Sequence, residues 1–108
     1  MIPSQMLKGI LENCILKIIS LHETYGYAIS QKLQSYGFME ISEGTIYPLL
    51  LRLEKNGLIT AAYKASDSGP PRKYFFITRA GQEELERFFK SWQEMETAIN
   101  RIFEEEER

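Results

Sequence analysis

Residues 41–59 read ISEGTIYPLLLRLEKNGLI, and this stretch predicts a short amphipathic helix that runs directly into a strand. Ser42 is a preferred N-cap residue, and the pair Asn56 and Gly57 is a typical helix stop. Four apolar side chains recur at i, i+3, i+4 and i+7, the spacing of one buried helix face: Ile46, Leu49, Leu50 and Leu53. One face of this helix is therefore expected to belong to a core.

The opposite face of the same helix is unusual for a surface that meets only water. At about 100° per residue it carries Gly44, Pro48, Leu51 and Lys55, flanked by Thr45, Tyr47 and Arg52. Its small and rigid residues and its low charge favour close contact with a flat-walled surface such as a DNA major groove. Pro48 has no N–H and crowds the carbonyl of Gly44, so we expect the helix to be distorted there or to begin only near Thr45.

Length and composition bound the class of protein. A chain of 108 residues with 44% hydrophobic residues is expected to form one ordered domain with a modest core. No apolar run reaches transmembrane length and no signal-peptide pattern opens the chain, so we expect no membrane association and a cytoplasmic location. Cys14 has no second cysteine to pair with, and its apolar neighbours predict a buried structural thiol in a reducing compartment.

The charge distribution is more informative than the net charge of −2. Residues 41–80 hold six basic and three acidic side chains, a net charge of +3. Residues 81–108 hold four basic and nine acidic side chains, a net charge of −5. A basic middle segment is a weak indication of DNA binding by itself, since solvated surface charge is the commoner cause.

The other elements follow from periodicity and turn residues. Residues 5–21 are predicted to form a first helix, and residues 25–36 a second one that ends at Gly37 and buries Ile29 and Leu33. Strands are predicted at residues 58–64 and 72–78 from their β-branched and aromatic content. Residues 65–71 contain two prolines and predict a rigid turn, so the two strands should form a β-hairpin with a projecting tip.

A last helix is expected to start near Thr78 or Arg79, with Thr78 as its cap. Its apolar residues are spaced alternately by three and four, as in a coiled-coil seam, and are Leu85, Phe88, Trp92, Met95, Ile99 and Ile102, widened by Phe89 and Phe103. At about 1.5 Å per residue this helix is roughly 40 Å long. It therefore extends beyond a domain of this size, and its apolar seam needs a partner.

The order helix, helix, helix, strand, strand is that of a winged helix-turn-helix. The predicted fold is accordingly mainly α with a two-stranded β-wing and a long C-terminal helix. Residues 1–78 would form a DNA-binding domain and residues 79–108 a dimerisation helix. The helix within residues 41–57 would be the recognition helix, and residues 64–73 the wing.

The chain resembles the PadR family of bacterial transcriptional regulators in four blocks that together span most of its length. They are YGY at residues 25–27, EGTIYPLLLRLEKNG at residues 43–57, GPPRKYF at residues 69–75 and TRAG at residues 78–81. The resemblance is to the small subfamily with a single C-terminal helix. It implies a homodimer that represses promoters, in which the first helix of one subunit packs on the last helix of the other. Some members release DNA when a small aromatic or cationic ligand binds.

The residues expected to contact DNA lie on the third helix and on the wing: Ser42, Gly44, Thr45, Tyr47, Pro48, Arg52, Lys55, Lys64, Arg72 and Lys73. Helix N-termini attract phosphate, although Ser42 and Thr45 can also serve as simple caps. Tyr47 can contact phosphate or be purely structural, and the basic residues can be solvated charges. Leu51 can meet a thymine methyl group or be buried under the hairpin, and we favour burial. The resemblance implies a packing role for Tyr25 and Tyr27, with phosphate contact from a hydroxyl as the alternative, and we favour packing.

The seam is expected to form a dimer interface of Leu85, Phe88, Phe89, Trp92, Met95, Ile99 and Ile102. A two-fold dimer would place two recognition helices about 34 Å apart, on successive major grooves of a palindromic operator. The resemblance makes Trp92, with Phe88, a candidate site for a small aromatic ligand between the subunits. A tryptophan at an interface also needs no ligand, and this simpler interpretation is the favoured one.

The sequence does not favour an enzyme. His22 has no second residue at catalytic spacing, and no catalytic residue, metal ligand set or cofactor motif is predicted. The main alternative to a DNA-binding regulator is a winged-helix protein–protein interaction module, which would share the fold and suit the acidic balance. A ligand carrier without a regulatory role is a further alternative.

Overall fold

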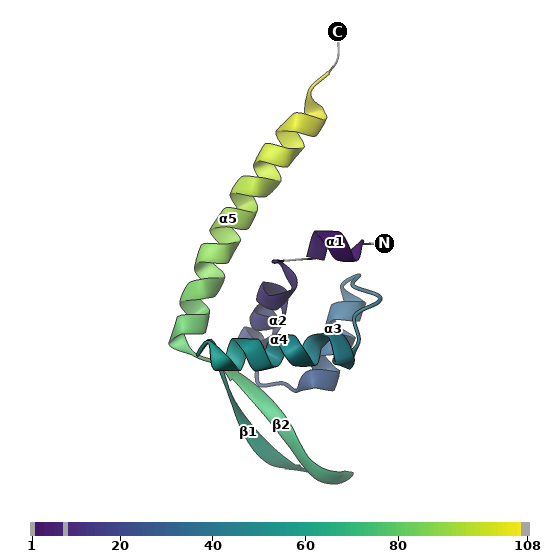
Figure 1. The fold of residues 1–108 in the computed structure, drawn as a ribbon, viewed down its shortest axis with the longest axis vertical. Coiled ribbons are helices and arrows are strands. Elements are labelled where there is room, and N and C mark those ends of the chain that lie inside the picture. The colour runs from purple at the N-terminus through teal and green to yellow at the C-terminus, as the bar shows by residue number, and fades with distance from the viewer. Residues whose placement is uncertain (1, 8, 107–108) are drawn as a thin grey trace.

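The computed structural model describes residues 2–7 and 9–106. Along this part of the chain the elements are α1 (Ser4–Leu7), α2 (Leu11–Leu21), α3 (Gly26–Ser35), α4 (Glu43–Lys55), β1 (Ile59–Ser66), β2 (Gly69–Ile77) and α5 (Arg79–Glu104). A body of α2, α3 and α4 carries two projections in opposite directions, the hairpin and α5 (Figure 1). The predicted mainly helical fold with a two-stranded wing and a long last helix is therefore confirmed.

The core lies where α2, α3 and α4 meet the base of the hairpin. Its fully buried side chains are Ile15, Leu16, Ile29, Leu33, Ile46, Leu50, Leu53, Ile59 and Phe75. The predicted stripe of α4 is confirmed at three positions, and Leu49 is partly buried beside them. The predicted pair on α3 is buried as well. Among the described helices, none has the length and hydropathy that a bilayer span requires.

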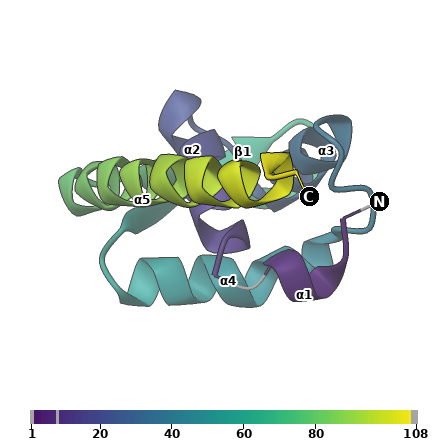
Figure 2. The ribbon, with the colours of Figure 1, turned by 90° about the horizontal axis from the view of Figure 1, so that it is seen from above.

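The prediction of one continuous first helix is wrong. A short α1 ends at Leu7, and α2 begins only at Leu11. Between them Gly9 has φ of +79°, a left-handed conformation that interrupts a right-handed helix and that glycine adopts without steric cost. As a result α1 turns away and does not continue the axis of α2 (Figure 2).

Helix α4 begins earlier than the proline suggested. It starts at Glu43, because the Ser42 carbonyl already accepts the N–H groups of Thr45 and Ile46, each at 3.1 Å. Pro48 lies inside the continuous helix, so the expectation of a start near Thr45 is wrong. Ser42 is the N-cap residue, but its hydroxyl lies 3.5 Å from the Thr45 hydroxyl and makes no cap bond to the backbone within the described residues.

The end of α4 follows the prediction. The Leu58 N–H donates to the Leu53 carbonyl at 3.0 Å, and the Gly57 N–H donates to the Glu54 carbonyl at 3.1 Å. This pair of bonds is a Schellman motif, which requires a left-handed residue, and Gly57 has φ of +75°. The motif reverses the chain and sends it directly into β1.

The hairpin strands are longer and the turn is shorter than predicted. The chain turns at residues 67–68, and Pro70 and Pro71 lie within β2. Lys64 pairs with Arg72, and Ser66 pairs with Gly69. Pro70 and Pro71 therefore lie opposite the single residue Ala65, and this mismatch of two residues against one is a β-bulge. A bulge in a two-stranded ribbon tolerates proline because fewer N–H groups are needed for pairing there.

Helix α5 is fixed to the base of the hairpin at its first turn. The Thr78 hydroxyl accepts the Gly81 N–H at 3.1 Å, as the predicted cap, and donates to the Gly57 carbonyl at 2.7 Å. Gly81 is buried against Leu58, which precedes β1, and against Ile77 at the end of β2: a Cβ atom at this position would lie 2.3 Å from the Leu58 carbonyl oxygen. The last helix can therefore pack only because residue 81 is glycine.

Candidate nucleic-acid interface

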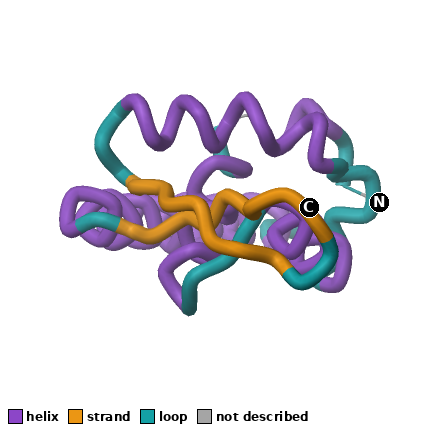
Figure 3. Tube along the Cα trace, turned by 90° about the horizontal axis from the view of Figure 1, so that it is seen from below, coloured by secondary structure: helices purple, strands orange, loops and turns teal. Residues whose placement is uncertain are grey.

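The outer face of α4 is open to solvent along its whole length. Its exposed residues are Gly44, Thr45, Tyr47, Pro48, Leu51 and Lys55. Leu51 is 53% exposed, so its expected burial under the hairpin is wrong. The hairpin leaves the body beside α4 and does not cover this face (Figure 3). Among the exposed residues of this face, the charged one is Lys55, at the C-terminal end of the helix.

Tyr47 links this outer face to the start of α3. Its side chain is 45% exposed, while one ring edge lies next to buried Gly26: a Cβ atom on Gly26 would be 3.9 Å from Tyr47 Cε2. Glu43 lies equally close to that glycine, at 3.7 Å from the same position. Tyr47 is therefore both a packing residue and an accessible hydroxyl, and the two readings given by the sequence are compatible.

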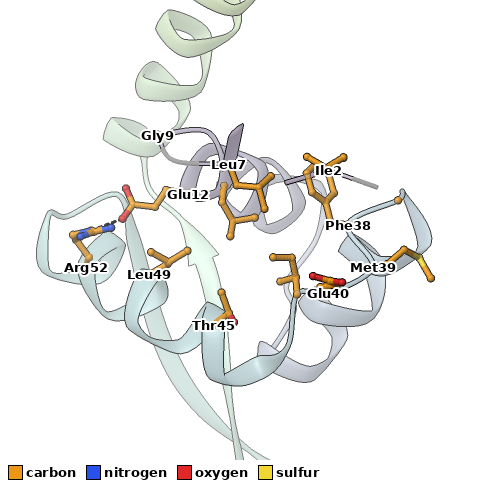
Figure 4. Close-up of a pocket in the computed structure, with 13 residues that line it drawn as sticks. Ile2, Leu7, Gly9, Glu12, Phe38, Met39, Glu40, Thr45, Leu49 and Arg52 are labelled. Atoms are coloured by element: carbon orange, nitrogen blue, oxygen red, sulfur yellow. Dashed lines mark hydrogen bonds and ion pairs between the residues drawn. The ribbon is translucent and has the colours of Figure 1, made fainter. Parts of the chain in front are cut away.

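Arg52 lies at one edge of the outer face of α4, one side of which it shares with Thr45. Its guanidinium pairs with Glu12 of α2, and both residues line a cavity of about 730 Å³ between α1, α2 and α4 (Figure 4). The cavity is lined mainly by apolar side chains, including Leu7, Leu11, Phe38, Ile41 and Leu49. Arg52 therefore flanks the outer face on the same edge as Thr45, and its side chain is 60% exposed.

The three basic residues of the wing do not share one face. Strand alternation and register place Lys64 and Arg72 on one side of the hairpin, and Lys73 on the other side with buried Phe75. Lys64 pairs with Glu23 at 2.6 Å, and Lys73 pairs with Glu54 of α4 at 3.1 Å. The Lys73 side chain is 18% exposed, against 45% for Lys64, so Lys73 joins the hairpin to α4 and does not lie at the tip.

Arg72 is held in a different way. Its guanidinium carbon lies 4.1 Å from the ring centroid of Tyr25, at the start of α3. The Tyr25 ring in turn meets Tyr74 edge-to-face, at 5.3 Å between centroids. For Tyr25 the sequence favours packing over phosphate contact, and it does not predict a position beside the wing. A sequence signal for this position does exist, because Tyr25 comes immediately after a short extended segment between two helices.

The apolar seam of α5 is largely uncovered in the single chain. Leu85, Phe88 and Trp92 are half-buried. The exposed large apolar residues of this helix are Phe89, Met95, Ile99, Ile102 and Phe103. The far end of the helix stands clear of the body (Figure 1). A contiguous apolar strip on a projecting helix is typical of a protein–protein interface.

Cys14 is half-buried on α2 and packs against the core. Burial raises the pKa of its thiol above the ordinary value, which keeps the sulfur protonated and unreactive at neutral pH. This environment agrees with a structural role.

Comparison with known proteins identifies a family. The profile of the Transcriptional regulator PadR-like family matches residues 15–87. A PadR-like transcriptional regulator from Bacillus cereus is 54% identical, with a TM-score of 0.86 over 94% of this chain and 99% of that one. A Streptococcus transcriptional regulator is 42% identical, with a TM-score of 0.82 over 93% and 98% of the two chains. Bacillus subtilis PadR, solved in complex with operator DNA, is 25% identical, with a TM-score of 0.68 over 75% of this chain and 47% of that chain.

Proposed function

The chain belongs to the PadR-like family of transcriptional regulators, and we propose that it acts as a homodimer that binds a palindromic operator and represses a nearby promoter. Members of the family are transcription regulators and not enzymes. The operator complex of the Bacillus subtilis relative supports double-stranded DNA as the partner.

The observation that carries this proposal is the bare outer face of α4 beside an exposed hairpin. A DNA major groove about 12 Å wide admits an α-helix, and Gly44 and Pro48 would let the backbone of α4 approach its floor. In this arrangement Ser42, Thr45 and Tyr47 meet phosphates or base edges near the helix start, and Lys55 meets a phosphate near its end. Lys64 and Arg72 approach the DNA backbone or the minor groove from the wing.

Three of the proposed contact residues, Arg52, Lys64 and Lys73, are already paired with carboxylates of their own chain. Surface ion pairs contribute only about 0–1 kcal/mol, so a phosphate competes effectively for each of these cations. The three residues contact DNA only after their pairs have opened.

The dimer is proposed to form through α5, with residues 1–78 as the DNA-binding domain and residues 79–108 as the dimerisation helix. The uncovered seam on α5 supports this assembly, because apolar side chains exposed in one chain gain most from a second copy. A two-fold axis between the helices would give the spacing of about 34 Å between recognition helices that successive major grooves require.

A ligand response is proposed for the same interface, with Trp92 and Phe88 stacking on a small aromatic or cationic molecule that releases DNA. Both side chains are half-buried in the single chain. Trp92 is the only tryptophan of the chain, so its fluorescence reports on this site alone. A ligand that quenches Trp92 and also weakens DNA binding would support the proposal, and a ligand-induced release of DNA without any change at Trp92 would place the response elsewhere.

Charge removal tests the DNA contacts. Each of the variants Arg52→Ala, Lys55→Ala, Arg72→Ala and Lys73→Ala is expected to weaken binding roughly three- to tenfold, because each loses about one phosphate contact. The slope of log affinity against log salt should fall by about one in each variant. Lys90→Ala removes the same charge from the exposed side of α5 and is expected to leave the slope unchanged. Equal slopes in all five variants would reject this contact set.

Freeing Lys73 is expected to have the opposite effect. Glu54→Gln removes the carboxylate that lies 3.1 Å from Lys73 Nζ and leaves a side chain of the same size. DNA binding should then tighten by roughly three- to tenfold and become steeper in salt. Glu84→Gln, which breaks a pair with Arg87 on α5, serves as the control. If the two variants behave alike, Lys73 does not take part in DNA binding.

A further inference from the structure

The segment before α3 contacts the hairpin through a single isolated β-bridge. The Phe75 N–H donates to the Thr24 carbonyl at 2.8 Å, and these two residues form an antiparallel bridge. Both side chains are buried on the core side. Because neighbouring residues of a strand point to opposite faces, Tyr25 projects onto the other face of the hairpin, together with Tyr74.

On that face Tyr25 is positioned from both sides. Its backbone carbonyl accepts the Ile29 N–H at 2.9 Å, which ties it to the first turn of α3. Its ring meets Tyr74 edge-to-face at 5.3 Å, with an angle of 65° between the ring planes. The guanidinium carbon of Arg72 lies 4.1 Å from the centre of this ring, well within the range of about 6 Å for a cation–π contact.

The other two wing cations also lie over aromatic rings, at 5.3 to 5.5 Å from the ring centroids, but each of them has an ion pair in addition. Lys64 and Lys73 are each neutralised by a carboxylate, at 2.6 and 3.1 Å. Arg72 takes part in none of the ion pairs found among the described residues. An aromatic ring fixes the direction of a guanidinium without cancelling its charge, so Arg72 is the wing cation whose full charge stays available to an incoming phosphate.

We propose that Tyr25 is a positioning residue, which stacks under Arg72 and holds its guanidinium in the orientation in which the wing meets DNA. The proposal rests on the proposed DNA-binding function. A guanidinium that is already ordered loses less conformational freedom on binding, which improves affinity without an additional contact. The stack also fixes the wing relative to α3. Because α3 packs against α4, the wing is thereby fixed relative to α4 as well.

A double-mutant cycle tests this role. The probe is a fluorescein-labelled duplex selected from genomic fragments with the wild-type protein, and affinity is measured by anisotropy at fixed salt. Tyr25→Leu is expected to weaken binding roughly two- to fivefold in the wild-type background and to have no effect when Arg72 is already alanine. Tyr25→Phe keeps the ring and should bind like wild type. Arg72→Lys keeps the charge but not the planar group, so it should lose a similar factor with an unchanged salt slope.

Tyr36→Leu is the matched control. Its ring also lies under a cation, Lys32 at 5.7 Å, but at the opposite end of α3 from the wing. Its removal should leave the affinity unchanged. A second readout is independent of DNA: the Arg72 Nε–H proton should show an upfield ring-current shift in NMR spectra of the free protein, which Tyr25→Leu abolishes and Tyr25→Phe retains.

The outcomes separate three situations. Coupling between Tyr25 and Arg72, with the ring-current shift, supports the positioning role. A loss from Tyr25→Leu that is equal in both Arg72 backgrounds means that Tyr25 only supports the fold and overturns the inference. If the wild-type protein selects no fragment in a salt-dependent way, the proposed function itself fails, and the role of Tyr25 in DNA binding fails with it, whatever the NMR shift.

Discussion

Replacing Gly81 with alanine is expected to lower the free energy of unfolding by about 3 kcal/mol, at the upper end of the range for an overpacked site. The new Cβ atom would lie 2.3 Å from the Leu58 carbonyl oxygen and 2.7 Å from Ile77 Cγ1. The Leu58 carbonyl cannot easily shift, since it also accepts the Thr78 N–H at 3.1 Å. The first turn of α5 would have to move off the hairpin and weaken its Thr78 cap. In a domain of this size the melting temperature should fall by roughly 10–20 °C.

Gly44→Ala provides the control for this prediction. A Cβ atom there would meet only the Ser42 hydroxyl, at 3.7 Å. Since alanine favours a helix over glycine, stability should be unchanged or should rise by up to about 1 kcal/mol. Both variants are compared with wild type by thermal unfolding at one protein concentration, because an associating protein melts in a concentration-dependent way. An unchanged melting temperature for Gly81→Ala would contradict the close packing of α5 on the hairpin.

A double substitution in the seam, Trp92→Asp with Ile99→Asp, is expected to convert the protein to monomers in analytical ultracentrifugation. Each carboxylate would have to be desolvated in the apolar interface proposed for α5, which is costlier than leaving the helices apart. DNA affinity should fall on the order of 100-fold or more, because two linked half-site contacts become one. Binding that remains should no longer depend on both halves of the operator.

Gln93→Asp with Thr97→Asp adds the same charge to the other side of α5 and should leave the dimer intact. Both of these side chains are exposed. If the seam variant still sediments as a dimer, the interface lies elsewhere on the molecule. If both double variants dissociate equally, the added charge and not the seam controls assembly.

Local signals in the sequence were sufficient for most of the fold. Helical spacing identified the buried residues of α4, because Ile46, Leu50 and Leu53 face one core whatever surrounds the helix. Gly57 identified its end, since the left-handed turn there depends on a single residue. The break at Gly9 was missed because the apolar pattern continues through it, and one glycine is a weak helix breaker.

The candidate site depended more on contacts between distant segments. Arg52 pairs with a residue 40 positions away and Lys73 with one 19 positions away, and no local pattern predicts these partners. The exposure of Leu51 depends on the direction in which the hairpin leaves the body, which the turn residues do not define. Tyr25 lies beside Arg72 because its neighbour Thr24 forms a β-bridge with Phe75.

The most direct test of the account is a mobility-shift titration of the full-length protein against the DNA upstream of its own gene, together with fragments selected from genomic DNA, across a salt series. The account predicts a specific complex whose affinity falls steeply as salt rises and whose salt slope decreases in Lys55→Ala and Arg72→Ala. Failure to bind any fragment in a salt-dependent way, or binding that ignores both substitutions, would contradict it and favour a winged-helix module that recognises another protein.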